Sequence, residues 1–260
     1  MSVFLDAFDR QLKPYVVELV RVHLNALEVA DMMQLIDWLE FYVHQSKAFE
    51  VLDAGTAPAG GALGIGVTGE GGEALGEEAE DESARGFVSR TRSGEEEYLE
   101  MAQNLIHEYL DRIKRQVREW FNNIKKHTVE IAKAPDGTLI TTVPEDMFNV
   151  VYMQLAVAQE KLPKEHLKDA VNACLQVLRE VQRQSYDQLE EDWERGVDPE
   201  ALCALVNDMQ RLQEKAEELF GKVIRAVQQD EDRDMLTQML EDVSSEYVSI
   251  ANVAKTYLTR

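Results

Sequence analysis

The sequence predicts an all-α protein made of elongated antiparallel helical bundles, with one long disordered insertion. Apolar residues recur at helical spacing along most of the 260 residues. Strands and helices do not alternate, and the connections between helical stretches are short. One segment departs completely from this pattern. We expect N-terminal helices over 1–52, the insertion over 53–94, a central helical bundle over 95–195, and the start of a C-terminal bundle over 196–260.

The composition argues against several classes of protein. Hydrophobic residues make up 45% and charged residues 29%, which is typical of a globular, charge-rich helical chain. The formal net charge of −22 would repel a phosphate backbone, so we expect no nucleic-acid partner. The N-terminus is not typical of a secretory signal, and no stretch approaches the ~18 apolar residues that a membrane span needs. The only cysteines, Cys174 and Cys203, are expected to be free thiols of a reduced cytoplasmic protein.

Two helices are predicted before the insertion. The first covers about residues 2–28 and contains Pro14, which would kink it or lie in its first turn. The second covers about residues 31–52, with Asp31 as its N-cap. In the first helix we expect the buried stripe to be Phe4, Phe8, Leu12, Tyr15, Leu19 and Val22. In the second helix we expect it to be Met32, Leu35, Trp38, Leu39, Tyr42 and Val43.

Residues 53–94 are rich in Gly, Ala and Glu and contain one aromatic residue, Phe87. Such a composition buries too little apolar surface to offset the entropy of ordering, so we expect a disordered surface loop. A Gly-x-Gly-x-x-Gly dinucleotide fingerprint occurs at 64–69. That motif needs a strand before it and a helix after it, whereas here it lies in low-complexity sequence beside an acidic run. We therefore interpret the fingerprint as a chance match.

A long helix is predicted over about 95–133, followed by a tight turn at Asp136-Gly137. The segment 138–143 is β-prone but too short to found a sheet. Pro144 suits the first turn of the next helix, expected over about 144–160. Its buried positions are expected to be Phe148, Val151, Leu155 and Ala158.

Three further helices are predicted towards the C-terminus. One covers about 163–195 and ends at Gly196. Asp198-Pro199-Glu200 is a strong start signal for the next, because it combines a cap, a proline and an acid in the first turn. The last covers about 231–259, and its apolar stripe continues to the end of the sequence. We expect that stripe to need a packing partner, as in a fragment of a longer chain.

No catalytic or metal-binding constellation is found in the sequence. None of the five histidines follows an acid by three positions, so the di-iron pattern of helical bundles is absent. Asp230, Asp232, Asp234 and Glu241 match a calcium loop, but Met235 stands where that loop requires glycine. We interpret these acids as favourable charges at a helix N-terminus. We expect no catalytic, cofactor-binding or metal-ligating residue, no small-molecule substrate and no enzymatic activity.

A basic band stands out in this acidic chain. Two interpretations are open: the solvated face of a helix with interleaved acids, which we favour, or docking to an acidic partner or to phosphoinositide head groups. The band consists of Arg112, Lys114, Arg115, Arg118, Lys125 and Lys126.

An ordered set of motifs spans most of the chain. It comprises Leu35-Ile36-Asp37-Trp38-x-x-Phe41-Tyr42, Tyr109-Leu110-x-x-Ile113, Trp120-Phe121-x-Asn123-Ile124, Gly137-Thr138-Leu139, Thr142-x-Pro144-x-Asp146-x-Phe148, Gln154-Leu155-x-x-Ala158 and Cys203-Ala204-x-Val206-Asn207-Asp208. Together these motifs resemble exocyst complex component 3, the Sec-six family of vesicle-tethering subunits. Its signature residues, expected to act in packing or interaction, are Trp38, Tyr109, Trp120, Asn123, Pro144, Asp146, Phe148, Gln154 and Asn207. Trp120 and Phe148 are expected to be apolar anchors.

The resemblance implies a rod of stacked helical bundles within an eight-subunit complex. That complex tethers secretory vesicles to the plasma membrane before SNARE-mediated fusion. Expected partners are other exocyst subunits and SNARE proteins, and the expected location is cytoplasmic and peripheral at sites of secretion on the plasma membrane. Residues 53–94 have no counterpart in the family, and the chain resembles a fragment of its middle region. The alternative is a generic helical scaffold or a cytoskeletal adaptor of spectrin-like type, although no regular internal period supports it.

Overall fold

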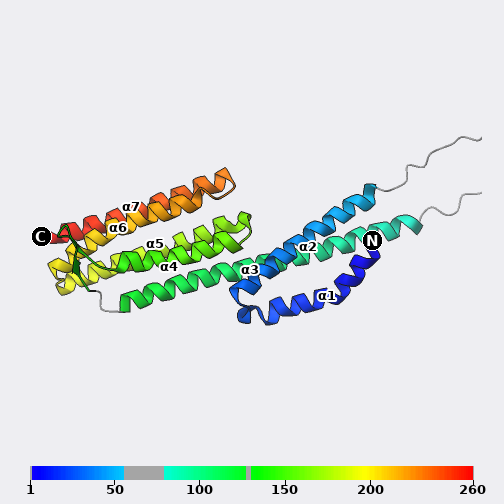
Figure 1. Cartoon of the computed structure of the whole chain (residues 1–260), viewed down its shortest axis with the longest axis horizontal. Coiled ribbons are helices and arrows are strands. Elements are labelled where there is room, and N and C mark those ends of the chain that lie inside the picture. Colours follow the sequence, from blue (N-terminus) through cyan, green and yellow to red (C-terminus); the bar gives the residue numbers. More distant parts are fainter. Residues whose placement is uncertain (1, 56–78, 127–129, 260) are drawn as a thin grey trace, which may run out of the picture. The chain divides into compact units, whose positions relative to one another are not determined.

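The computed structural model describes residues 2–55, 79–126 and 130–259, and these residues are almost entirely helical (Figure 1). The α-helices are α1 (Ser2–Val22), α2 (Val29–Gly55), α3 (Ala79–Lys126), α4 (Val143–Lys161), α5 (Leu167–Arg195), α6 (Pro199–Ile224) and α7 (Asp230–Leu258). Two 3-10 turns, η1 (Leu24–Ala26) and η2 (Lys164–His166), precede α2 and α5. The predicted all-α class is confirmed.

The chain forms two compact units, 1–107 and 108–260, and α3 contributes to both. In the first unit, α2 buries Met32, Leu39 and Val43, as the sequence predicts. The rings of Tyr42 and Tyr98 meet edge to face, with centroids 5.1 Å apart. The core of this unit is therefore a set of aliphatic and aromatic side chains from its helices.

The stripe predicted for the first helix is wrong over its second half. Tyr15 is 72% exposed and Val22 is 66% exposed, whereas Val16 and Val20 are buried. The two stripes are neighbours on one helix and are both apolar, so helical spacing alone does not select between them. Of the other predicted positions, Leu12 is half-buried and Leu19 is 36% exposed. The side chains of Phe4 and Phe8 lie outside the description.

The second unit contains α4 to α7 and the end of α3. Helix α6 packs along α7, while α5 packs on α7 and α4 packs on α6 (Figure 1). Most predicted core positions are confirmed, because the apolar stripes of these helices all face one another. Positions of the predicted stripes that are buried include Val171, Cys174, Leu178, Ala216, Leu236, Val243, Tyr247, Ile250 and Ala254. Phe220, which is not among the predicted positions, is fully buried as well. The boundary predicted at 195/196 lies inside this unit, between α5 and α6.

Several helix ends follow local sequence chemistry. The Asp198 side chain accepts a hydrogen bond from the backbone N–H of Glu200 at 3.1 Å, which confirms the predicted cap of α6. Gly196 ends α5 with φ +87°, a left-handed conformation that suits glycine. The prediction for Asp31 is wrong, because α2 begins at Val29 and places this residue in its first turn.

The predicted helix over 95–133 also ends early, at Lys126. Residues 132–133 form a short strand, β1 (Ala132–Lys133), which pairs antiparallel with β2 (Leu139–Ile140). Gly137 turns the chain between them with φ +90°, as the Asp136-Gly137 motif predicts. This hairpin brings the segment before α4 against α6.

Helices α2 and α3 extend into the residue range predicted for the insertion, 53–94, one from each end. Helix α2 continues to Gly55 and α3 begins at Ala79. The middle of the insertion, 56–78, lies outside the described residues, and so does the glycine fingerprint at 64–69. Among the described helices, none is long and apolar enough to cross a bilayer.

The two cysteines are free thiols, as predicted. Cys174 is buried in α5, and burial raises the pKa of its thiol to about 12. Cys203 in α6 is partly exposed. Because the thiolate is the reactive form, the environment of Cys174 makes it an inert core residue.

Candidate functional site

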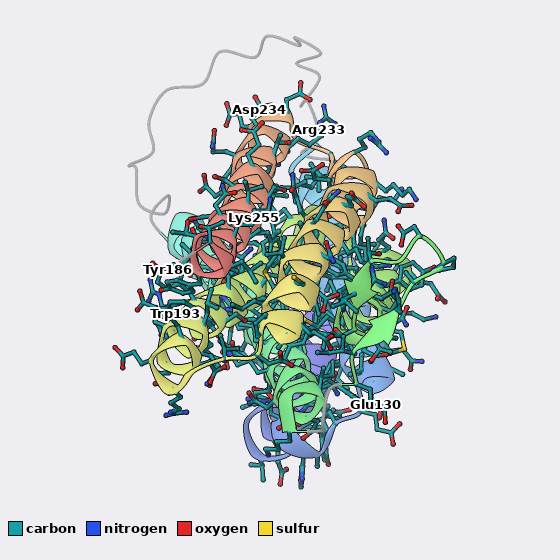
Figure 2. All side chains as sticks on the ribbon, turned by 90° about the vertical axis from the view of Figure 1, so that its left-hand side faces the viewer. Glu130, Tyr186, Trp193, Arg233, Asp234 and Lys255 are labelled. Carbon is teal, nitrogen blue, oxygen red and sulfur yellow. The ribbon has the colours of Figure 1, made fainter. Side chains whose placement is uncertain are left out.

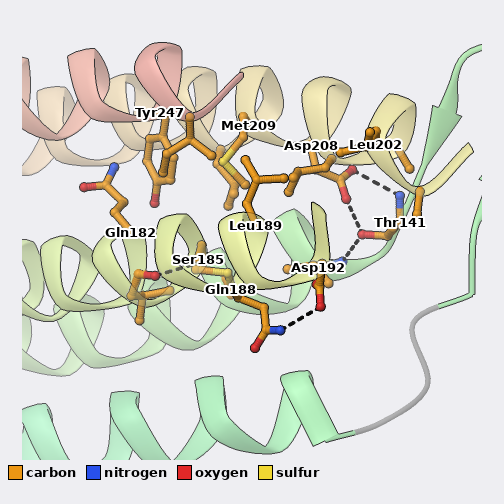
Figure 3. Close-up of a pocket in the computed structure, with 18 of the residues that line it drawn as sticks. Thr141, Gln182, Ser185, Gln188, Leu189, Asp192, Leu202, Asp208, Met209 and Tyr247 are labelled. Carbon is orange, nitrogen blue, oxygen red and sulfur yellow. Dashed lines mark hydrogen bonds between the residues drawn. The ribbon is translucent and has the colours of Figure 1, made fainter. Parts of the chain in front are cut away.

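Helix α6 holds the segment between β2 and α4 through a set of polar contacts (Figure 3). The Asn207 amide Nδ2 donates to the backbone oxygen of Leu139 at 2.8 Å. The backbone N–H and the hydroxyl of Thr141 both donate to the carboxylate of Asp208, the former at 3.1 Å. Arg211 Nη1 donates to the backbone oxygen of Thr141 at 2.9 Å. The backbone polar groups of this connection are thus satisfied by side chains from α6.

Arg211 also ties this connection to the first turn of α4. Its guanidinium pairs with Glu145 and lies 3.3 Å from the carboxylate of Asp208. Lys215 Nζ lies 3.3 Å from the other carboxylate oxygen of Glu145. We call this set the polar clamp: Glu145, Asn207, Asp208, Arg211 and Lys215.

The carboxylates of the clamp have opposite pKa shifts. Burial raises the pKa of Asp208, and the hydrogen bonds from Thr141 and Arg211 oppose that shift without overcoming it. Burial would also raise the pKa of Glu145, but hydrogen bonds and charge from Arg211 and Lys215 lower it overall. Both carboxylates have structural partners, so their shifted pKa values reflect an ion-pair network.

The clamp predicts an acid-sensitive contribution to stability. Since the pKa of folded Glu145 lies below its ordinary value of 4.5, its contribution is complete above pH 4.5 and is lost as the pH falls through the folded value. We expect Glu145→Gln to lower the free energy of unfolding at neutral pH, and the difference from the unmodified chain to shrink below pH 4.5. Urea unfolding of both proteins across this pH range measures the difference in their free energies of unfolding. A difference that grows on acidification would contradict the role given to the Glu145 ion pairs.

A groove lies beside the clamp, within the second unit (Figure 3). Its volume is about 470 Å³, and its walls are mainly aliphatic side chains of α5 and α6. Apolar lining residues are Phe121, Ile124, Ile131, Val143, Met147, Val181, Leu189, Val197, Ala201, Leu202, Ala204, Leu205, Met209, Leu212 and Ile250. Polar lining residues are Thr141, Gln182, Ser185, Gln188, Asp192, Asp208 and Tyr247.

Two buried polar groups of the groove have no hydrogen-bond partner among the residues that the structure describes. Gln182 is 1% exposed, and its amide Nε2 donates to the backbone oxygen of Val243 at 2.7 Å. Its Oε1 and the hydroxyl of Tyr247, which is 2% exposed, have no hydrogen-bond partner in the described part of the chain. Burial raises the pKa of Tyr247, so its hydroxyl is neutral. No sequence motif marks Gln182 and Tyr247 as a polar site, because they line the same groove only when α5 packs against α7.

The three arginines of the basic band are paired within the molecule. Arg112 and Arg115 both bind the carboxylate of Glu108, at 3.0 and 2.7 Å. Arg118 donates through Nε and Nη2 to both carboxylate oxygens of Glu180, at 2.6 and 2.8 Å. This bidentate pair lowers the pKa of Glu180. These contacts favour the solvated-face interpretation, and docking through the band stays a prediction.

A lipid test separates the two interpretations of the band. Because its three arginines have internal carboxylate partners, we expect vesicles containing a phosphoinositide to bind the chain no better than vesicles of neutral lipid. Cosedimentation at low and physiological salt measures this. The docking interpretation requires positive charge that can reach the lipid head groups. It would be established instead if the chain bound phosphoinositide vesicles and the double substitution Lys125→Glu, Lys126→Glu abolished that binding.

The signature residues divide into buried and exposed groups. Tyr109, Pro144 and Phe148 are buried, Trp38 and Gln154 are half-buried, and Asn123 and Asp146 are exposed. The structure brings Asn207 to the hairpin that precedes Pro144, where its amide contacts the backbone of Leu139. Trp120 is 53% exposed, so the expectation that it anchors the core is wrong. Its neighbour Phe121 takes the buried position.

Other candidates from the sequence have structural explanations. The three aspartates of the calcium-like motif lie at the start of α7, whereas Glu241 lies further along the helix. Asp230 pairs with Arg233, and Asp232 lies 3.0 Å from Lys168. Arg233 and Asp234 mark this end of the helix in Figure 2. Trp193 is half-buried and stacks on Tyr257, with ring centroids 4.4 Å apart. These residues stabilise helix ends and contacts between helices.

Comparison with known proteins identifies relatives of this chain. A family model described as "Exocyst complex component Sec6" matches residues 1–260. A solved structure, "Crystal structure of the C-terminal domain of the exocyst subunit Sec6p", is similar to it with a TM-score of 0.53 at 18% sequence identity. The similarity covers 60% of this chain and 47% of that chain, so it spans about half of the solved domain. No curated protein matches. The likeness to the solved structure shows a shared helical fold.

Proposed function

Because the chain belongs to the exocyst complex component Sec6 family, we propose that it is a non-catalytic subunit tethering secretory vesicles to the plasma membrane before SNARE-mediated fusion. The family match over all 260 residues carries this proposal. Within the family, we assign the chain to exocyst complex component 3. Its proposed partners are other exocyst subunits and SNARE proteins, and its proposed location is the cytoplasmic side of the plasma membrane at sites of secretion.

The chemistry of the groove supports a binding role. Of the described residues that line it, none is histidine, cysteine or lysine, so its serine and threonine have no neighbouring histidine or lysine as a base. The hydroxyl of Ser185 donates to the backbone oxygen of Val181, and that of Thr141 donates to Asp208. Its two carboxylates, Asp192 and Asp208, are engaged by Gln188 and by Thr141 with Arg211. The groove therefore resembles a recognition surface, with apolar walls and a few placed polar groups.

The outer face of α4 supports assembly with other proteins. Tyr152, Met153 and Val157 are 60%, 52% and 39% exposed. Aromatic residues and methionine are enriched where proteins meet, so this face suits burial against a partner. Tethering requires that subunits hold one another at fixed distances. Helical units whose cores are complete and whose outer faces are apolar provide such contacts.

Depletion of the chain from secreting cells tests the proposed tethering role. We expect vesicles to accumulate beneath the plasma membrane and secretion of a reporter to fall, with recovery on re-expression. Electron microscopy and a secretion assay measure the two effects. Unchanged secretion and vesicle number after complete depletion would contradict the proposal. The SNARE contact is tested separately, by binding of purified SNARE proteins to the purified chain.

A further inference from the structure

The two unpartnered polar groups of the groove point to a ligand. The Nε2 of Gln182 is held by the backbone oxygen of Val243, so the opposite amide atom, Oε1, is an acceptor fixed in place. Tyr247 projects from α7 towards α5, and its hydroxyl also lacks a partner (Figure 3). A buried acceptor without a donor is unfavourable, and an O–H or N–H from a bound group would satisfy it. We infer that one end of the groove accepts such a group.

The length of the groove fits a short helix. Its α5 wall runs from Gln182 to Asp192 and its α6 wall from Ala201 to Leu212. At about 1.5 Å per residue each wall is about 15 Å long, which is the length of about three helical turns. The apolar face of an amphipathic helix enters such grooves through side chains at helical spacing.

The charge of the lining favours a cationic partner. Its titratable groups are Asp192 and Asp208, and no Lys or Arg is among the described lining residues. Asp208 is buried and paired with Arg211. Asp192 lies at the far end from Gln182, with Gln188 as its hydrogen-bond donor, 2.9 Å away, and with Arg195 Nη1 4.0 Å from its carboxylate. The chain as a whole carries a formal charge of −22. A partner with Lys or Arg beside its apolar stripe would complement this end.

We propose that the groove between α5 and α6 binds an amphipathic helix of another subunit of the complex. Its apolar stripe fills the groove, a side chain with an O–H or N–H reaches Gln182 and Tyr247, and a basic residue lies beside Asp192. This inference rests on the proposed function, because it requires a complex in which the chain is a subunit. It adds the location of one contact and the chemistry of the partner.

Photocrosslinking in the assembled complex tests the inference. Gln188 is exposed and lines the groove, so a benzophenone amino acid placed there reaches a bound helix. Gln176, exposed on the same helix but outside the groove, is the control position. We expect crosslinks from position 188 to one segment of another subunit, with apolar residues at helical spacing and neighbouring Lys or Arg. The control should not reach that segment.

Substitutions in the groove make the result specific. Ala201→Trp fills the groove and should reduce the crosslink at least tenfold, while Ala226→Trp, at an exposed position of the chain outside the groove, should leave it unchanged. Tyr247→Phe keeps the ring, removes the hydroxyl, and should weaken the crosslink about fivefold to tenfold. Asp192→Lys should also weaken the crosslink, and the dependence of the crosslink yield on salt concentration should change. Normal recovery of the complex with each variant shows that folding is intact.

The possible failures are distinguishable. If no exocyst subunit co-purifies with the unmodified chain, the proposed function fails, and this inference fails with it. If the complex is recovered but position 188 gives no crosslink to another subunit, the groove inference alone is overturned. Crosslinking to an acidic segment, or protection of the groove only by a small amphiphile such as dodecanol, would also overturn it. Persistence of the crosslink in the Ala201→Trp variant would place the contact outside the groove.

Discussion

Replacing Phe220 by alanine should lower the free energy of unfolding of the second unit by about 3–5 kcal/mol. Phe220 is fully buried in α6, which packs along α7. Removing its ring deletes apolar contacts and leaves a cavity that packed helices close only in part. Hydrogen–deuterium exchange of α6 and α7 amides measures this loss within the second unit, and urea unfolding of the whole chain gives the total.

A matched substitution controls for the loss of an aromatic ring. Phe41 in α2 is 62% exposed, so Phe41→Ala should change the free energy of unfolding by no more than about 0.5 kcal/mol. Equal effects of the two substitutions would contradict the assigned packing. So would unchanged exchange in α6 and α7 when Phe220 is replaced, because the seam between these helices is the main internal contact of the unit.

Replacing Asp208 by alanine should cost about 2–3 kcal/mol of stability. The substitution removes the acceptor of the Thr141 backbone N–H and hydroxyl, and it removes a carboxylate beside Arg211. A buried donor left without an acceptor loses its hydration without compensation. We expect exchange to rise first in the segment between β2 and α4, because α6 holds this segment through the clamp.

Two further substitutions distinguish the effect of breaking the clamp from the effect of removing any negative charge. Asp208→Asn keeps an acceptor oxygen and should cost about half as much. Asp242→Ala breaks the exposed pair with Arg179, 2.9 Å apart, and should cost no more than about 1 kcal/mol, because solvent screens exposed pairs. A loss for Asp242→Ala as large as that for Asp208→Ala would show that the clamp has no special role.

The helices could be predicted because their stabilising patterns are local. Apolar spacing identified α4 to α7, and Asp198 and Gly196 marked helix ends through contacts made within a few residues. The failures concern choices between neighbouring apolar faces. In α3 both Trp120 and Phe121 follow an apolar pattern, and only tertiary packing buries Phe121. The predicted family is confirmed by the match over the whole chain, whereas its functional details are proposals.

The candidate site could be predicted only in part. The resemblance named Asn207, which contacts the backbone of Leu139. It gave no role to Arg211 or Glu145, because residues more than 60 positions apart meet only after α6 packs on α4. The groove has no local signal either, since its lining residues come from several helices that meet only in the packed structure. Its unpartnered atoms on Gln182 and Tyr247 become evident only in the packed structure.

The most direct test of the account is purification of the tagged chain, under gentle conditions, from cells that normally express it. The chain is proposed to act through assembly, so other exocyst subunits should co-purify in stable, near-equimolar amounts and should elute with it as one large species. An untagged strain and the Phe220→Ala variant are the controls for specificity and for folding. Recovery of the folded, tagged chain without any exocyst subunit would contradict the account.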